Sequence, residues 1–295
     1  MTLFKMVVGI CAYNEENNIG LVLQNLISEQ DLPKDCKILV VCSGCTDKTP
    51  EIVREFHRRD ERIESIIENV RKGKANALNT IFKIARKSAD VLVLVNADAL
   101  PKRGSVKRLI SKLATSNAGA VFAQPVPFEG VRGFSYKIVR VIWHLHHVIS
   151  LHQIPKLSGE LCAIRMSCLP EIPENVATDE PYIELAIRNQ GYDIVYVPEA
   201  FVYIRCPTNV VDLLKQRKRI QLGHMQLKSA TCFKVSTSSY RNVLRAFSAL
   251  KPNEVLYALL GGFIEIIAYF QARIDLGKGM VSYIWEPIKS TKTSI

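Results

Sequence analysis

Two oxygen-bearing side chains follow an apolar run of the sequence. Residues 89–97 read ADVLVLVNA, and Asn96 and Asp98 stand at the end of that run. Amide and carboxylate oxygens are ligands that Mg²⁺ and Mn²⁺ accept, and the end of a buried strand could hold them together. The alternative is that both residues only begin a turn before Pro101, because Asn and Asp are common turn formers. The spacing by itself leaves both interpretations open.

A second pair of acidic side chains, Asp179 and Glu180, follows Thr178. A carboxylate within hydrogen-bond reach of a hydroxyl group can remove its proton as a new bond forms. The same residues could also cap the helix expected over 181–190 and favour its dipole. These two interpretations are compatible, so the pair is a candidate for general-base catalysis and for helix capping.

The first hundred residues contain the elements that must position such side chains. Apolar strand-like runs at 5–13, 36–44, 62–70 and 89–97 alternate with runs of helical spacing at 18–30, 47–59 and 74–89. This alternation predicts a parallel sheet with right-handed crossovers. Ligands bind such sheets beyond the carboxyl ends of the strands. The polar residues at the first two strand ends are Tyr13, Asn14, Glu15, Ser43, Gly44 and Asp47.

Composition and missing motifs narrow the class of protein. The chain has 295 residues, 48% of them hydrophobic, which indicates a globular protein. It contains neither GxGxxG after the first strand nor GxxxxGK[ST], so dinucleotide-binding and P-loop folds are disfavoured. The net charge of +11 is local: residues 1–100 carry 14 basic and 14 acidic side chains, and residues 201–295 carry 14 and 5. A basic last third suits an anionic partner such as a diphosphate, a nucleic acid or a membrane surface.

Five segments occur in an order that resembles the inverting family 2 glycosyltransferases, nucleotide-sugar-dependent enzymes of the GT-A fold. They are AYNEENNI, VVCSGCTDKTPEIV, KGKANALN, NAD, and TDE followed by QRKRI. The resemblance spans residues 7–223 and implies an α/β fold with a mostly parallel central sheet flanked by helices. We expect a GT-A domain over 1–228, with a nucleotide-binding half at 1–100 and an acceptor half at 101–228. A basic, partly apolar helical extension should follow over 229–295.

The resemblance implies a donor site with a divalent cation, Mn²⁺ or Mg²⁺. Asp98 matches the second aspartate of the family's DxD motif, and Asn96 stands in place of the first. Cys42 and Ser43 replace two acids that usually follow the second strand, which leaves the base open, with UDP favoured over GDP. The residues assigned to the nucleotide sugar are Ala12, Tyr13, Asn14, Glu15, Ser43, Gly44, Asp47, Lys74, Asn96, Ala97, Gln216 and Arg219.

The resemblance also implies the acceptor side. TDE is similar to the family's TED, which makes Glu180 the general base and Asp179 the other acid. SGELCAIR, at 158–165, is similar to the stretch that lines the acceptor site and assigns Ser158, Gly159 and Glu160 to it.

His147 joins this group from the histidine-rich run at 138–152, where no acidic or cysteine partner stands at zinc-binding spacing. QRKRI departs from the family's QxxRW at Ile220, which removes an aromatic platform and argues against a processive synthase.

The extension has its own signals. Residues 255–270 are apolar apart from Glu265, yet these 16 residues fall short of the roughly 20 needed to cross a bilayer. The run could rest on anionic headgroups, aided by basic residues such as Lys251, Arg273 and Lys278, or it could be a buried helix or an oligomer contact. The first residues show no secretory signal. We therefore expect a cytoplasmic protein that could be peripheral at the inner face of the membrane.

These observations favour one function over three alternatives. We expect sugar transfer to a hydroxyl acceptor such as a glycan, a glycolipid or a lipid-linked glycan. An impaired GT-A protein acting as a binding module is the first alternative, given the departures at Ser43, Asn96 and Ile220. A nucleotidyltransferase would carry a glycine-rich loop where AYNEEN stands. Nucleic-acid binding is disfavoured because the basic tail lacks interleaved aromatic residues.

Overall fold

A computed structural model describes residues 4–130, 133–152, 155–233 and 240–292. In these ranges an eight-stranded mixed sheet has the order β3-β2-β1-β4-β7-β6-β8-β5. β1 pairs in parallel with β2 and β4, β2 with β3, and β6 with β8; β7 pairs antiparallel with β4 and β6, and β5 with β8. The strands are β1 Met6–Ala12, β2 Lys37–Ser43, β3 Ile63–Glu68, β4 Val91–Val95, β5 Ala99–Pro101, β6 Ala118–Pro127, β7 Leu161–Arg165 and β8 Asp193–Ile204.

Helices cover both faces of this sheet. Those named in the rest of the article are α1 Ile19–Glu29, α2 Thr49–Arg59, α3 Lys74–Ala85, α4 Ser105–Ala114, α5 Phe134–His152, α6 Glu180–Asn189, α7 Val210–Thr231, α8 Tyr240–Phe247 and α9 Pro252–Gly277. Successive strand residues point to opposite faces, so Val8 and Ile10 of β1 pack toward α1, α2 and α4. Val7 packs on the other side with α3 and α6. The strands and helices predicted in the first hundred residues are all present.

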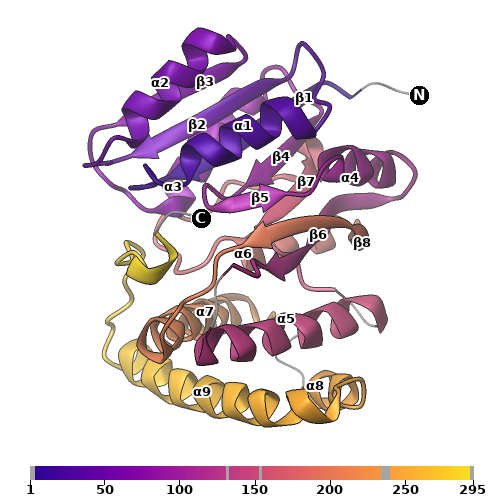
Figure 1. The fold of residues 1–295 in the computed structure, drawn as a ribbon, viewed down its shortest axis with the longest axis vertical. Helices are drawn as coiled ribbons and strands as arrows, with labels where there is room; N and C mark the ends of the chain where they lie inside the picture. Colours follow the sequence, from indigo (N-terminus) through magenta and orange to yellow (C-terminus); the bar gives the residue numbers. More distant parts are fainter. Residues whose placement is uncertain (1–3, 131–132, 153–154, 234–239, 293–295) are drawn as a thin grey trace.

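A helical layer lies beneath the sheet. Figure 1 shows α5 and α7 below the strands, with α9 outermost and α8 at its end. Ile138, Leu213 and Ile264 join α5, α7 and α9 in a small core. Ion pairs between α7 and α9 join Arg217 to Glu265 and Lys218 to Asp275. The helical extension predicted over 229–295 therefore packs along the domain rather than projecting from it.

Helix α9 is longer than the apolar run that predicted it. It has 26 residues and is long and apolar enough to cross a membrane, and 28% of its most apolar window is buried against the protein. It packs lengthwise on α7 and α5, so one face is covered by protein. The other face carries exposed large apolar side chains: Leu256, Leu259, Phe263, Ile266, Phe270 and Ile274.

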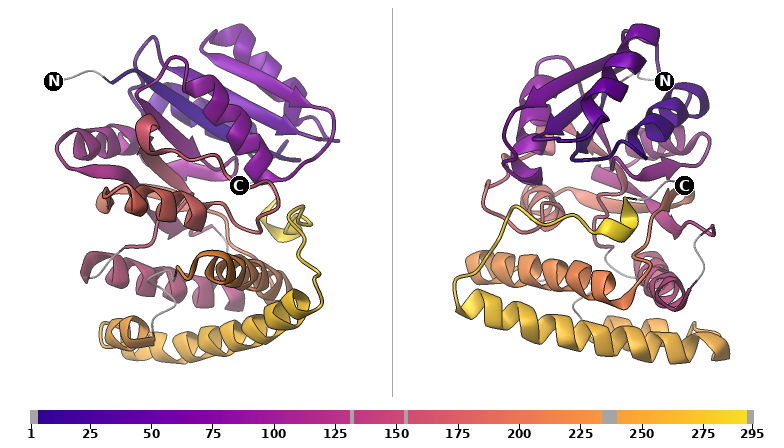
Figure 2. Two further views of the ribbon diagram at one scale, coloured as in Figure 1. Left: turned by 180° about the vertical axis from the view of Figure 1, so that it is seen from behind. Right: turned by 60° about the vertical axis from the view of Figure 1, so that its left-hand side comes forward.

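After α9 the chain turns back toward the sheet. We call residues 281–292 the C-terminal strap. Figure 2 shows this yellow segment rising from the end of α9 to the level of the strands. The Trp285 indole N–H donates to the Ala177 carbonyl at 3.1 Å, and the Ser290 hydroxyl donates to Asp212 Oδ2 at 2.6 Å. The strap ends beside the loop that follows β1, where Asn17 Nδ2 donates to the Lys292 carbonyl at 2.9 Å.

Candidate active site

The polar strand ends meet in one cleft. Because β1, β2 and β4 are parallel, their carboxyl ends lie at the same edge of the sheet. Nine of the twelve residues predicted to bind the nucleotide sugar line this cleft, together with Asp98. We call it the donor cleft. Its predicted lining residues are Ala12, Tyr13, Glu15, Ser43, Lys74, Asn96, Ala97, Gln216 and Arg219.

Three predicted residues lie outside that lining and connect the loops around it. Asn14 donates from Nδ2 to Thr46 Oγ1 at 3.0 Å and accepts from the Thr46 N–H at 2.8 Å. Asp47 accepts from the Glu16 N–H at 3.0 Å and the Thr49 N–H at 3.0 Å. Gly44 has φ +63°, and a Cβ there would meet the Arg71 backbone nitrogen at 2.5 Å. These residues hold the loops after β1 and β2 together and so shape the cleft indirectly.

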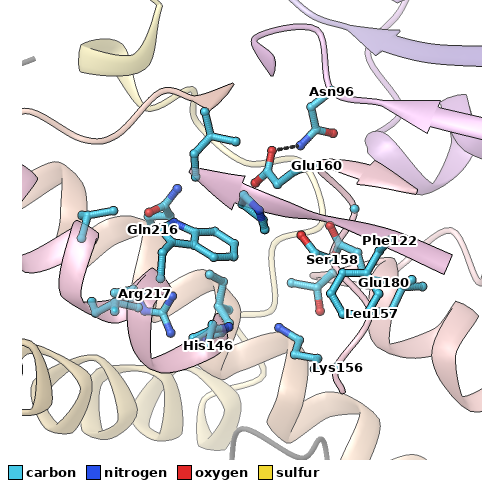
Figure 3. Close-up of a pocket in the computed structure, with 18 of the residues that line it drawn as sticks. Asn96, Phe122, His146, Lys156, Leu157, Ser158, Glu160, Glu180, Gln216 and Arg217 are labelled. Carbon is cyan, nitrogen blue, oxygen red and sulfur yellow. Dashed lines mark hydrogen bonds between the residues drawn. The ribbon is translucent and has the colours of Figure 1, made fainter. Parts of the chain in front are cut away.

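Three acidic side chains meet near the end of β4. Burial, and then the charge of Asp98, raise the pKa of both Glu15 and Glu160 to about 7. Asn96 donates from Nδ2 to Glu160 Oε2 at 2.7 Å, so its carbonyl oxygen remains available as a ligand (Figure 3). The Asp98 carboxylate has no hydrogen-bond or ion-pair partner among the described side chains. A divalent cation here would relieve the repulsion among these acids.

The protein groups fit a cation that is shared with a bound diphosphate. Within the described ranges, no cluster of three or more His, Cys, Asp or Glu side chains is arranged to hold a metal ion. Mg²⁺ and similar ions are often held by one or two carboxylates together with substrate phosphates. Asp98 and the carbonyl of Asn96 match that pattern, in which the phosphates complete the coordination.

Basic side chains surround the same cleft, and several were not predicted. The Arg71 guanidinium lies 3.8 Å from the centroid of the Tyr13 ring. Arg205 follows β8, and its Nε and Nη2 atoms are buried without a hydrogen-bond partner in the described structure. Arg219, which was predicted, also lines the cleft, with its Nε in the same state. Unpaired buried guanidinium atoms are costly, so these two arginines are prepared for an anionic ligand.

An acidic side chain contacts Ser43, one of the two residues that replace the family's usual acids. Ser43 is buried and donates to Glu68 Oε2 at 2.6 Å, and Thr80 donates to the other Glu68 oxygen at 3.1 Å. Glu68 ends β3, the neighbouring strand, so a carboxylate reaches the β2 end from a different element. The pairing of β2 with β3 could not be read from the motif itself, and Glu68 was missed for that reason.

A second cavity adjoins the donor cleft and contains all four residues predicted to bind the acceptor. We call it the acceptor cavity; Figure 3 shows it between β-strands above and helices below. Its walls include Ser158, Gly159 and Glu160 from the loop before β7, and Glu180 from α6. His147 of α5 also lines it and hydrogen-bonds through Nδ1 to the Tyr196 hydroxyl at 2.7 Å. Residues that line both cavities are Lys74, Asn96, Glu160, Ile204, Arg205, Gln216 and Arg219.

The two predicted catalytic acids share one lysine. Lys74 Nζ lies 3.2 Å from Asp179 Oδ2 and 3.5 Å from Glu180 Oε1. Asp179 occupies the N-cap position of α6, but its side chain makes no capping hydrogen bond. Asp179 therefore stands where a carboxylate favours the helix dipole, but it does not cap α6 by a hydrogen bond. Glu180 lines the acceptor cavity, whereas Asp179 does not; both acids line a separate small space with Lys74.

The pKa values of Asp179 and Glu180 are shifted in opposite directions. Burial and the nearby Glu180 raise the pKa of Asp179. Burial would also raise the pKa of Glu180, but Lys74 and Lys156 outweigh it and lower that pKa to about 2. Burial acts to lower the pKa of Lys74, yet the two carboxylates prevail and raise it. Glu180 is consequently ionised at neutral pH and faces the cavity in the form that accepts a proton.

Gly159 makes room for this carboxylate. A Cβ at Gly159 would lie 2.5 Å from Glu180 Oε1 and 2.8 Å from its Cγ. Any larger residue would push Glu180 away from its position between the loop and α6. The glycine of the SGEL segment therefore leaves space for Glu180; it was predicted as an acceptor contact.

The acceptor cavity also has basic lining residues that were not predicted. Lys156 lies near His146 and Arg217, as the labelled side chains in Figure 3 show. Burial, followed by the charges of Lys156 and Arg217, lowers the pKa of His146 to about 3. His224 of α7 has its pKa lowered by the same causes. Both histidines are therefore neutral at physiological pH. Of the two basic neighbours, Arg217 is paired with Glu265, and burial lowers the pKa of Lys156.

Sequence comparisons agree with the motifs. The family model "Glycosyl transferase family 2" matches residues 7–169. The probable glycosyltransferase YdaM of Bacillus subtilis is 24% identical over 280 residues, covering 90% of this chain and 63% of the relative. The uncharacterized protein MJ0544 of Methanocaldococcus jannaschii is 33% identical over 234 residues, covering 76% of this chain and 98% of that protein. The chain thus spans less than two thirds of YdaM and nearly all of MJ0544.

A structural comparison shows the same fold. The mannosyltransferase PcManGT from Pyrobaculum calidifontis, solved in complex with GDP-Man and Mn²⁺, superposes with a TM-score of 0.60 at 23% identity. The match covers 98% of this chain and 83% of that one. At this identity the likeness establishes the arrangement of strands and helices, and the expected mixed α/β fold is confirmed.

Proposed function

Because the chain belongs to glycosyl transferase family 2, we propose that it transfers a sugar from a nucleoside-diphosphate sugar to an acceptor hydroxyl with inversion at the anomeric carbon. The donor would occupy the donor cleft, and the acceptor would enter through the acceptor cavity. The observation that carries this proposal is the position of Glu180. It is ionised and faces the acceptor cavity, which meets the donor cleft at Asn96 and Glu160.

The proposed chemistry assigns a step to each side of this junction. A carboxylate in hydrogen-bond reach of the acceptor hydroxyl takes its proton as the hydroxyl oxygen attacks the sugar C1. The departing nucleoside diphosphate gains negative charge, and Arg205 and Arg219 are the basic groups with unpaired buried atoms at that place. Attack from one cavity with departure into the other inverts the anomeric centre. Lys74 positions Glu180 through their ion pair.

A divalent cation, Mn²⁺ or Mg²⁺, would neutralise the donor's phosphates and stabilise the leaving group. Asp98 and the carbonyl oxygen of Asn96 are the groups proposed to hold it, beside Glu15 and Glu160. For the base of the donor we propose uracil over guanine. Ser43 lines the cleft at the end of β2. Its hydroxyl proton is donated to Glu68, so its oxygen would accept a hydrogen bond from the base.

For the acceptor we propose a glycan, a glycolipid or a lipid-linked glycan at the cytoplasmic face of the membrane. The exposed apolar side chains of α9 form one continuous helix face, with Lys251, Arg273 and Lys278 exposed along the same helix or directly at its ends. An apolar face flanked by basic residues suits contact with anionic headgroups. Such contact would place the helical layer on the membrane and keep the sheet in the cytoplasm.

A thermal-shift panel with UDP, GDP, CDP and TDP, each with and without Mn²⁺, tests the donor site. We expect a metal-dependent rise in melting temperature with UDP, because a ligand that binds only the folded state stabilises it. The absence of a shift with every diphosphate would contradict the proposal and favour a binding module of another specificity.

Slow hydrolysis of the matching nucleotide sugar then tests the chemistry. Proton NMR should show that the first sugar released has the anomeric configuration opposite to the donor's. Glu180→Gln should slow transfer at least about a hundredfold while nucleotide binding is retained. The control is Glu171→Gln, an exposed acid outside both cavities. Equal activity of Glu180→Gln and the wild type would remove Glu180 as the base.

A further inference from the structure

The C-terminal strap lies directly over the donor cleft. Six of its residues line that cleft: Trp285, Glu286, Pro287, Ile288, Thr291 and Lys292. Figure 2 shows the strap passing from α9 to the sheet on the side where the chain ends. None of these residues belongs to a motif that matched the family, and the family model ends at residue 169. The motifs that matched the family therefore did not predict this wall.

Hydrogen bonds and an ion pair at Trp285, Ser290 and Lys292 hold the strap in place. At one end, the Arg71 guanidinium donates to the Trp285 carbonyl, and the Trp285 indole donates to Ala177. In the middle, Ser290 donates to Asp212 near the start of α7. At the far end, Lys292 Nζ pairs with Glu15 and donates to the Tyr13 carbonyl at 3.1 Å. Each anchor joins the strap to an element that already borders the donor cleft.

The sequence beneath the strap is adapted to it. Gly73 has φ +96°, and a Cβ there would lie 3.2 Å from the Tyr283 carbonyl oxygen. Trp285 and Val281 pack on a small core of Ala177, Leu222 and Ala272. Gly73 thus leaves room for the backbone of the strap at Tyr283, and the buried core receives the Trp285 indole. Both features fit a strap that is packed in this position.

Lys292 brings a positive charge to the most acidic part of the cleft. Its side chain is 25% exposed, whereas that of Glu15 is 7% exposed, so the ion pair is largely withdrawn from water. Lys292, Asp98 and Arg205 line the same cleft. Arg205 has two buried guanidinium nitrogens, Nε and Nη2, without a hydrogen-bond partner in the described structure. Together with the Lys292 ammonium group, they are well suited to bind a phosphate group.

We propose that the C-terminal strap is a wall of the donor cleft and that Lys292 is a donor-binding residue whose ammonium group contacts the diphosphate. This inference rests on the proposed function, because it assumes a nucleoside diphosphate in the cleft. It assigns the last described residues of the chain to the substrate site. The competing possibility is that Lys292 only fills the cleft until a ligand displaces it, and the two differ in the sign of a mutational effect.

Calorimetric titration of the full chain with UDP and GDP in Mn²⁺ separates these possibilities. Lys292→Ala should weaken diphosphate binding about tenfold, the usual effect of losing one charge-assisted hydrogen bond. Lys292→Arg should stay within about threefold of the wild type, since it keeps the charge. The matched control is Lys87→Ala, an exposed lysine just after α3 that lies outside the cleft. Unchanged or tighter binding by Lys292→Ala would overturn the inference.

A second variant tests the wall without touching the ligand. Ser290→Ala removes the anchor on Asp212 and should weaken diphosphate binding by a smaller factor, about threefold. If this variant binds like the wild type, the strap is no wall of the site. If the wild type itself binds none of the diphosphates, the proposed function fails and this inference fails with it. If the wild type, Lys292→Ala and Ser290→Ala all bind the diphosphate equally, this inference is refuted and the proposed function is not.

Discussion

At the scale of single residues, the two cavities differ in the charges that they present. The donor cleft joins acidic groups near β4 with arginines that have unpaired buried atoms. The acceptor cavity is lined by the ionised Glu180 and by Lys156, which helps to keep Glu180 ionised. A cation and a diphosphate would satisfy the first, and an acceptor hydroxyl facing a carboxylate would satisfy the second.

The metal assignment can be tested at Asp98. Asp98→Asn keeps the shape of the side chain and removes its negative charge, so the affinity for Mn²⁺ in the presence of UDP should fall at least about tenfold. Isothermal titration with Mn²⁺ at saturating UDP measures this. Asp90→Asn, an exposed aspartate before β4, is the control. If Asp98→Asn leaves the metal dependence intact, another group holds the cation.

The buried histidines predict how stability depends on pH. The pKa of His146 is lowered to about 3 in the folded protein from an ordinary value near 6.5, so the unfolded chain binds more protons between these values. Stability should therefore fall as the pH decreases from 6.5 toward 3, with a limiting slope of about 1.4 kcal/mol per pH unit for one proton. His224 contributes in the same direction.

Urea denaturation at several pH values between 4 and 6.5 checks this expectation. His146→Gln removes one titrating group and should flatten the dependence of the unfolding free energy on pH. His152→Gln serves as the control, because His152 is exposed at the end of the same helix. A slope that is the same in His146→Gln and the wild type would show that His146 is charged in the folded protein.

At the scale of elements, the close approach of a helix to a loop positions the two acids proposed for catalysis. A Cβ at Gly223 in α7 would overlap the Thr178 hydroxyl, directly before Asp179 and Glu180. Helix α7 therefore supports the loop that carries both acids, and the same helix supplies Gln216 and Arg219 to the cavities. The QRKRI motif and the TDE motif, which lie far apart in the sequence, are joined by this contact.

Two helical glycines give a matched prediction. Gly223→Ala should destabilise the protein by about 1–3 kcal/mol, because a methyl group must force α7 away from Thr178. Gly262→Ala in α9, where no atom lies within 4 Å of an added Cβ, should stabilise by up to about 1 kcal/mol through helix propensity alone. Chemical denaturation of both variants measures the difference. Equal effects would mean that α7 does not pack tightly on the loop.

At the scale of the whole molecule, the strap connects the outermost helix, α9, to the donor cleft at the edge of the sheet. The outer face of α9 is apolar, the inner face packs on α7 and α5, and the strap leads from the end of α9 to the donor cleft. The exposed apolar face of α9 is suited to lipid, and the donor cleft is the place proposed for the nucleotide sugar. The arrangement would allow an acceptor held at a membrane to meet a donor taken from the cytoplasm.

The membrane contact can be tested by vesicle co-sedimentation. Replacing both Leu259 and Phe263 by Glu should reduce binding to vesicles rich in phosphatidylserine at least about tenfold, since each buried apolar side chain contributes roughly 1.5–3 kcal/mol. The control is Leu21→Glu, which alters an exposed leucine of α1. If the wild type does not sediment with these vesicles at low salt, α9 is a protein-facing helix and the proposed location is wrong.

The sequence determined the elements whose signals are local. Alternating strand and helix runs predicted four strands and three helices in the first hundred residues, because hydrophobic periodicity is a property of neighbours along the chain. The short β5, which begins at Ala99, was not predicted. The family motifs marked the strand ends and Glu180, because their residue types and order can be read directly. They also indicated the fold class, since strands and helices that alternate in this way leave few possible arrangements.

Tertiary structure decided what comes from distant parts of the chain. Glu68 reaches Ser43 through the pairing of two strands, Gly159 yields space to a residue of α6, and Lys292 meets Glu15 across nearly the whole sequence. No local pattern encodes such contacts, because they depend on packing between elements rather than on spacing within one. The charges around Glu180, and hence its ionised state, likewise arise when Lys74 and Lys156 are brought to it by folding.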